Sequence, residues 1–285
     1  MSESSASSPS VRAFHLPTLI AIAIVAFALA NVAHEGLGHG GMCVAVGGKP
    51  LILNAIYFDC DRDALQSTAS RWISAAGTLV NLALALLTTF VIRMRFVRAP
   101  SGRYFLWLFL VLNLFQATGY WMFSGLGGIG DWNAVVRGTP FYLAARVVLA
   151  IVGAGAYFFF VIPLALRGLA PFLGAADPER IERGRRLCVP AYLAGGMLYV
   201  TAGLLNPEGL KLVLISAVAA SFGGASGLFW MWNLLRNRGR FPPVSEPADA
   251  AGAALGIERS WPWIGAGAAI ALAFVLILGP GIHFG

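Results

Sequence analysis

The sequence predicts an all-α polytopic membrane protein with about seven transmembrane helices and a short β segment at the membrane face. Of its 285 residues, 58% are hydrophobic and 12% are charged, and the mean hydropathy is +0.74. A single soluble domain could not bury this much apolar surface in one core. Runs of about 20 apolar residues, long enough to cross a hydrocarbon layer of about 30 Å, recur along the whole chain.

Seven apolar segments have the length of a span. Between the first two lies the stretch from Gly47 to Asp63, which is too short to cross and is rich in β-branched and aromatic residues. A short strand or hairpin is predicted there. The predicted spans are Pro17–Val46, Thr68–Ile92, Tyr104–Leu126, Phe141–Leu169, Pro190–Leu205, Gly209–Leu235 and Trp261–Gly279.

These spans divide the chain into five segments. Residues 1–16 are Ser-rich and are expected to form a disordered tail without a signal cleavage site. Residues 17–135 form a membrane core of three spans, and residues 136–240 contribute additional membrane helices. A linker rich in Pro and Ala follows at 241–260, and residues 261–285 carry the last transmembrane helix.

The net charge of +7 comes from arginines in short clusters between apolar runs. Such clusters indicate membrane topology and no nucleic-acid partner, because positive loops stay in the cytoplasm. The pattern predicts an integral protein of the cell (inner) membrane with a cytoplasmic N-terminus and an external C-terminus. The clusters are Arg93, Arg95, Arg98 and Arg103 after span two, Arg180, Arg183, Arg185 and Arg186 after span four, and Arg236, Arg238 and Arg240 after span six.

The first span contains His34-Glu35-Gly36-Leu37-Gly38-His39. Ionisable residues inside a membrane are costly and persist mainly where they line a polar cavity or bind an ion. In HExxH zinc hydrolases the two histidines are four residues apart and the glutamate is the general base. A spacing of five in an ideal helix places the imidazoles about 140° apart, so the glycines must permit a π-type turn. The alternative to a metal site is that the two histidines and Glu35 only hydrogen-bond to neighbouring helices, with the glycines permitting close packing.

A third metal ligand is expected from the end of span three. Asp131 follows a glycine-rich stretch there, and spans one and three both run outward, so Asp131 and the histidines are predicted at the same membrane depth. A zinc site with one position open for water would then consist of His34, His39 and Asp131. A helix-capping role for Asp131 is the alternative.

The three cysteines are Cys43, Cys60 and Cys188, and because they form no CxxC pair we expect free thiols.

The first 135 residues resemble the site-2 protease class of intramembrane metalloproteases, the M50 peptidases. Three features carry the resemblance: the motif helix followed by the strand-like stretch, the segment from Ala75 to Ala83, and Asn113 leading to Asp131. Thr78 stands where the class has a proline and Trp132 where it has a glycine. The HExxGH form of the motif also resembles that of dipeptidyl peptidase III. The resemblance implies a zinc metallopeptidase that cleaves membrane-associated peptides.

The expected chemistry is zinc-assisted hydrolysis in which Glu35 activates water and passes the proton to the leaving group. Asn81 and Asn113 lie midway along their spans and either orient substrate or stabilise an oxyanion, or only pack. The stretch from Leu51 to Phe58 offers a strand edge for a peptide. Two alternatives remain: an amidase or esterase acting on a lipid or small amphiphile, and a non-catalytic metal-binding membrane protein.

Overall fold

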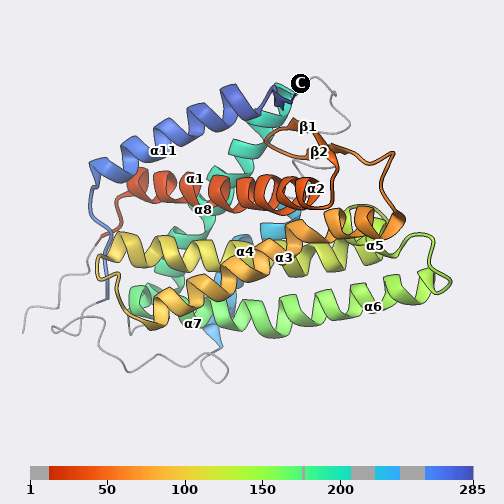
Figure 1. Cartoon of the computed structure of the whole chain (residues 1–285). Helices are drawn as coiled ribbons and strands as arrows, with labels where there is room; N and C mark the ends of the chain where they lie inside the picture. Colours follow the sequence, from red (N-terminus) through yellow and green to blue (C-terminus); the bar gives the residue numbers. More distant parts are fainter. Residues whose placement is uncertain (1–12, 175–176, 207–221, 238–253, 285) are drawn as a thin grey trace, which may run out of the picture.

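The computed structural model describes residues 13–174, 177–206, 222–237 and 254–284 as a bundle of long helices with a small sheet at one end (Figure 1). Six of these helices are long and apolar enough to cross a membrane, which confirms the all-α polytopic class. The six spans are Leu16–Ala45, Ser67–Arg93, Pro100–Gly127, Tyr142–Leu173, Pro178–Leu204 and Trp261–Leu278.

The first half of the chain contains one interrupted helix, a hairpin and two uninterrupted helices. Its elements are α1 (Leu16–Val32), the π-helical η1 (Ala33–Gly40), α2 (Gly41–Ala45), β1 (Lys49–Leu53), β2 (Phe58–Asp61), α3 (Ser67–Arg93), α4 (Pro100–Gly127) and α5 (Asp131–Val136). The second half adds α6 (Tyr142–Gly155), the π-helical η2 (Ala156–Val161), α7 (Ile162–Leu173), α8 (Asp177–Leu204), η4 (Gly224–Ser226), α10 (Gly227–Trp230), η5 (Met231–Arg236), α11 (Trp261–Ala273), η6 (Phe274–Leu278) and β3 (Ile282–His283).

The later predicted spans differ from the structure at two places. The segment Gly209–Leu235 lies partly outside the described residues, and its described part forms only the short helical segments η4, α10 and η5. The span predicted to start at Pro190 begins earlier, because α8 runs straight through this proline. Arg180, Arg183, Arg185 and Arg186 therefore belong to the first turns of α8 and not to a loop.

The predicted strand segment forms the centre of a three-stranded antiparallel sheet with the order β2-β1-β3. Ile52 and Leu53 pair with β2 on one side and with β3 on the other. The prediction that this stretch offers an open edge is therefore wrong for β1, because both of its sides are paired. Within the described sheet, the outer strands are β2, which begins at Phe58, and the two-residue β3.

The expectation of three free thiols is also wrong. Cys43 at the end of the first span and Cys60 in β2 form a disulfide, and only Cys188 is a free, buried thiol. Gly48 makes this possible, since a Cβ there would lie 2.7 Å from the Cys60 sulfur and 3.0 Å from that of Cys43. Sequence spacing gave no sign of the pair because the hairpin folds back onto the helix that precedes it.

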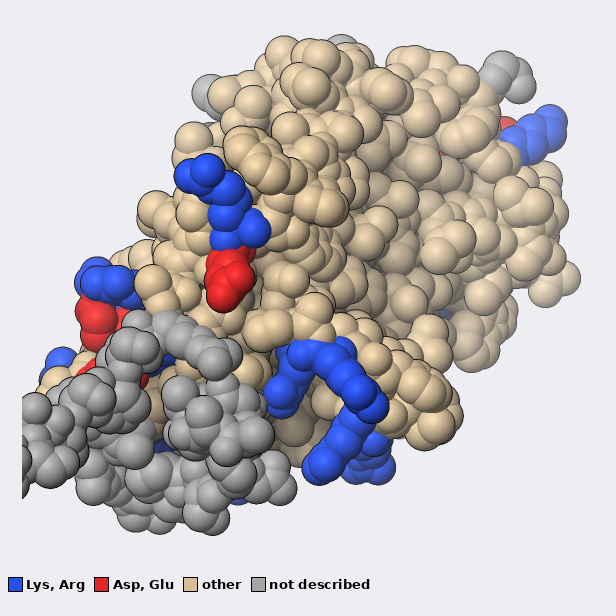
Figure 2. Space-filling model, turned by 90° about the vertical axis from the view of Figure 1, so that its left-hand side faces the viewer, with Lys and Arg blue, Asp and Glu red and all other residues tan. Residues whose placement is uncertain are grey.

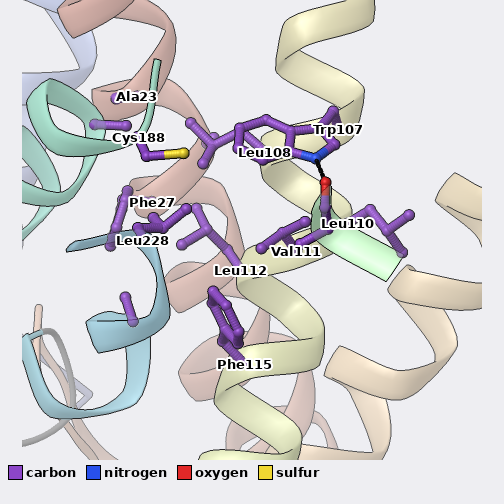
Figure 3. Close-up of a cluster of buried hydrophobic side chains, with 14 of the residues drawn as sticks. Ala23, Phe27, Trp107, Leu108, Leu110, Val111, Leu112, Phe115, Cys188 and Leu228 are labelled. Carbon is purple, nitrogen blue, oxygen red and sulfur yellow. Dashed lines mark hydrogen bonds between the residues drawn. The ribbon is translucent and has the colours of Figure 1, made fainter. Parts of the chain in front are cut away.

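The core of the bundle surrounds α1, which packs against α4, α8 and α11. Figure 3 shows this core, where Phe27 of α1 and Phe115 of α4 are fully buried near Leu228. The indole N–H of Trp107 donates to the carbonyl oxygen of Ala165 at 2.9 Å, so the polar group of this large side chain is paired as it is buried.

The two ends of the bundle differ in charge. At the end opposite the sheet, Phe14 forms a β-bridge with Ile257, and the first arginine cluster follows α3. Figure 2 views this end, where cationic side chains gather and several arch over a hollow. The C-terminal strand β3 lies in the sheet at the other end (Figure 1), so the described chain starts and finishes at opposite ends of the bundle.

Candidate metal centre

The two motif histidines come together because the first span is π-helical between Ala33 and Gly40. This confirms the predicted bulge: a π turn brings residues five apart back into line. The imidazole centroids of His34 and His39 lie 4.8 Å apart. Gly38 permits η1 to approach α3, since a Cβ at this position would lie 2.5 Å from the Cα of Gly77.

Asp131 completes a compact triangle with the two histidines. The Nε2 atoms of His34 and His39 lie 3.2 Å apart, and Oδ2 of Asp131 lies 3.3 Å from the first and 3.4 Å from the second. Both imidazoles are buried, whereas the Asp131 side chain is 23% exposed. The three residues that the sequence singled out thus form a group that could hold a metal ion.

The hydrogen bonds of the two Nδ1 atoms, which point away from the triangle, determine which ring nitrogens carry protons. Nδ1 of His39 lies 2.7 Å from the carbonyl oxygen of Ile73, so this nitrogen is the donor. Nδ1 of His34 lies 2.5 Å from Oδ1 of Asn81 and likewise donates. In neutral imidazoles the two Nε2 atoms then carry lone pairs, and they point at each other and at a carboxylate oxygen.

This donor set fits a metal ion. Three lone-pair acceptors converging in a buried site repel one another unless a cation lies between them. Ligand atoms about 2.0 to 2.1 Å from a tetrahedral zinc ion lie about 3.3 to 3.4 Å from one another, which agrees with the three separations given above. Two histidine nitrogens and a carboxylate oxygen are a known catalytic zinc ligand set that leaves a fourth position open.

Asp131 is placed by a glycine turn. The preceding residue, Gly130, has φ of +82°, a conformation that glycine adopts readily, and Asp131 then starts the short helix α5. Burial opposes ionisation of Asp131, but protons on the imidazoles of His39 and His34 would stabilise its carboxylate and hold the pKa of Asp131 well below its usual range. A bound cation would take the place of those protons and leave the carboxylate as an anionic ligand.

Glu35 lies beside this triangle and faces a cavity. It is 5% exposed, and its carboxyl group lies close to the backbone of Phe58 at the start of β2. The cavity has a volume of about 410 Å³ and reaches both His39 and Asp131. Most of its remaining wall is apolar or aromatic, and includes Ile56, Phe58, Tyr120, Met122, Phe123, Leu126 and Ile129.

The structure places the two predicted asparagines behind His34 and away from the cavity. Asn81 accepts the His34 bond, and its Nδ2 donates to Oδ1 of Asn113 at 2.8 Å. The same nitrogen donates to Oε1 of Gln116 at 2.9 Å. Partners of this kind fix the tautomer and the orientation of a metal-binding histidine.

Two further residues near His34 were not predicted from the sequence. Gln116 holds the amide of Asn81, and the ring of Tyr120 stacks on the His34 imidazole with centroids 5.2 Å apart. With Asn113, they sit at positions i, i+3 and i+7 of α4, which places them on one helix face. A polar stripe at this spacing inside a predicted span was the signal that could have identified them.

Comparisons of the chain with protein-family models, with curated proteins and with solved structures gave no match. The six candidate spans and the group of His34, His39 and Asp131 define the described chain as a polytopic helical membrane protein with a candidate metal centre.

Proposed function

We propose that this protein is a membrane-embedded, zinc-dependent hydrolase, and that it is a metallopeptidase of the kind the site-2 protease resemblance implies. The observation that carries the proposal is the convergence of three acceptor atoms at 3.2 to 3.4 Å next to a buried carboxyl group that faces a cavity. A purely structural site needs no such carboxyl group and no open side.

The chain's own residues have separate tasks in this proposal. His34, His39 and Asp131 hold the ion, and a bound zinc ion would polarise a carbonyl group and make water more acidic. Glu35 accepts the proton of the attacking water as general base and delivers it to the leaving group. Asn81 holds the His34 ring so that its Nε2 keeps facing the ion.

The cavity and the sheet favour a peptide as substrate. The cavity wall is largely apolar, which suits a hydrophobic segment, and the unpaired edge of β2 starts at Phe58 beside Glu35. An extended peptide that adds to this edge would bring its backbone carbonyl groups towards the three metal ligands. An amphiphilic ester or amide would use the cavity without the sheet edge.

The site end of the bundle faces outward in this proposal, and the N-terminus is cytoplasmic. The Cys43–Cys60 disulfide lies at the site end, and disulfides persist in oxidising compartments outside the cytoplasm. Arginines after α3 and at the start of α8 mark the opposite end as cytoplasmic. Two independent features, one redox and one electrostatic, support the same orientation.

A cleavage assay in liposomes tests the proposal. Single-span peptides of varied sequence are incubated with the zinc-loaded protein, and products are identified by mass spectrometry. The wild type should cleave a subset of them, and Glu35→Gln should reduce the rate by at least about 100-fold, the lower end of the range for general-base catalysis. Asp63→Asn is the matched control, because Asp63 is an exposed carboxylate at the same end that lies outside the cavity.

Two outcomes would contradict parts of the proposal. Hydrolysis of lipid esters or amides without cleavage of any peptide would exclude the peptidase and leave a metal-dependent hydrolase. Equal rates for Glu35→Gln and wild type would exclude Glu35 as general base.

A further inference from the structure

A second cavity lies at the arginine end of the bundle, between α3, α4 and α7. Its volume is about 1270 Å³, and its walls are mostly apolar. Five arginines border it: Arg93, Arg95, Arg98, Arg103 and Arg167. The metal centre and its cavity share no lining residue with this groove, so its occupant is a separate question from the proposed hydrolysis.

The five arginines have no partner in the part of the chain that the structure describes. Within the residues that the structure describes, none of them forms an ion pair or a hydrogen bond, and no carboxylate lines the groove. Other arginines at this end are paired: Arg185 and Arg186 both bind Glu182. Guanidinium groups gathered around one opening repel each other, and planar, multidentate groups of this kind suit phosphate oxygens.

The apolar part of the groove has the depth of one membrane leaflet. Along α3 it extends from Arg93 to Leu82, and along α4 from Arg103 to Leu114. Each stretch covers about 16 Å of helix, and half of a hydrocarbon core of about 30 Å is about 15 Å. A groove that starts at cationic side chains and ends near the bilayer midplane matches one lipid in one leaflet.

We propose that this groove binds an anionic phospholipid, with the phosphate held by the arginines and the acyl chains lying against α3, α4 and α7. Basic pockets between transmembrane helices on the cytoplasmic side are suited to such head groups. The need for positive cytoplasmic loops accounts for arginines at this end of the bundle. It does not account for five arginines that have no partner among the described residues and surround an apolar groove of leaflet depth. They lie at the end of the bundle where Figure 2 shows cationic side chains arching over a hollow.

Lipid titration of the purified full-length protein in detergent tests this proposal, with bound lipid counted by native mass spectrometry. Phosphatidylglycerol and phosphatidylcholine with the same acyl chains are compared on the wild type and on two double variants. Arg103→Gln with Arg167→Gln removes two charges from the groove. Arg185→Gln with Arg186→Gln removes two charges from the same end outside the groove and is the matched control.

The wild type should bind one phosphatidylglycerol in preference to phosphatidylcholine. The groove variant should bind it roughly 30-fold more weakly, since each arginine near an anionic surface contributes roughly five-fold in affinity. The control should change by less than about three-fold.

Three results would overturn the proposal: equal affinity for both lipids, an equal loss in the two double variants, or displacement by soluble glycerol 3-phosphate at the lipid's own concentration. The first two indicate nonspecific surface charge, and the third indicates an ion site that does not use the apolar groove. None of these results bears on zinc binding or hydrolysis, so failure here is distinguishable from failure of the proposed function.

Discussion

The indole N–H of Trp132 donates a hydrogen bond to the hydroxyl oxygen of Thr78 at 2.9 Å. These are two of the positions at which the sequence departs from the pattern of the class it resembles, and their side chains touch each other. Trp132 directly follows the candidate ligand Asp131, and Thr78 directly follows Gly77, which lies against both imidazoles. The bond therefore connects the carboxylate side of the candidate metal centre to α3, the helix that packs against the two histidines.

This bond should contribute to metal affinity. Removing it in Trp132→Phe or in Thr78→Val should weaken zinc binding by about five-fold, since one hydrogen bond is worth about 1 kcal/mol. Chelator competition on the purified protein measures the affinity. The double variant should be no weaker than either single variant, because both remove the same interaction. Additive losses would show that the two side chains act independently.

Gly77 should tolerate no side chain. A Cβ there would lie 2.6 Å from Nε2 of His34 and 2.7 Å from Nε2 of His39, inside the space of both ligands. Gly77→Ala should weaken zinc binding by more than the roughly 100-fold that loss of an outer partner causes. Gly265→Ala is the control, because a Cβ at that helical position meets nothing within 4 Å. Unchanged zinc affinity in Gly77→Ala would contradict the ligand geometry.

The side chains behind His34 should show a graded effect on metal binding. Asn81→Leu removes the acceptor of the His34 Nδ1 proton and should lower zinc affinity by about 10- to 100-fold. Asn113→Leu leaves that bond in place and removes one acceptor of the Asn81 amide, so a loss of only about 2- to 10-fold is expected. Isothermal titration with zinc gives both values. A reversed order would show that Asn81 does not position His34.

The disulfide should be detectable by counting thiols. Protein denatured without reductant should react with maleimide only at Cys188, whereas reduced protein should react at all three cysteines, as read from the intact mass. Replacing Cys43 and Cys60 by serine should lower the free energy of unfolding by about 3 kcal/mol, given the 17-residue separation. Three reactive thiols before reduction would remove the redox support for an outward-facing site.

Much of the site could be predicted from the sequence because its constraints are local. The spacing of His34 and His39, with glycines between them, requires a π turn, and the structure has one. The position of Asp131 near the histidines could be predicted from the topology, since two spans that run in the same direction end at the same membrane depth. Long apolar runs likewise located the first four spans to within a few residues.

The remaining features depend on contacts between distant parts of the chain. The Cys43–Cys60 pair requires the hairpin to fold back onto the first span, and β1 loses its open edge only because β3 returns from the far end of the sequence. The start of α8 was placed too late because its first turns carry arginines and glutamates, which are unlike an apolar span. Hydropathy alone cannot separate such a helical extension from a loop.

The metal content of the purified protein tests the central claim most directly. Elemental analysis after dialysis against trace zinc should find one zinc ion per chain in the wild type and in Glu35→Gln, because Glu35 is not a ligand in this account. His39→Ala should hold none, while circular dichroism shows the helical bundle intact. A wild type that binds no zinc, or a His39→Ala variant that keeps its full content, would contradict a metal centre formed by His34, His39 and Asp131.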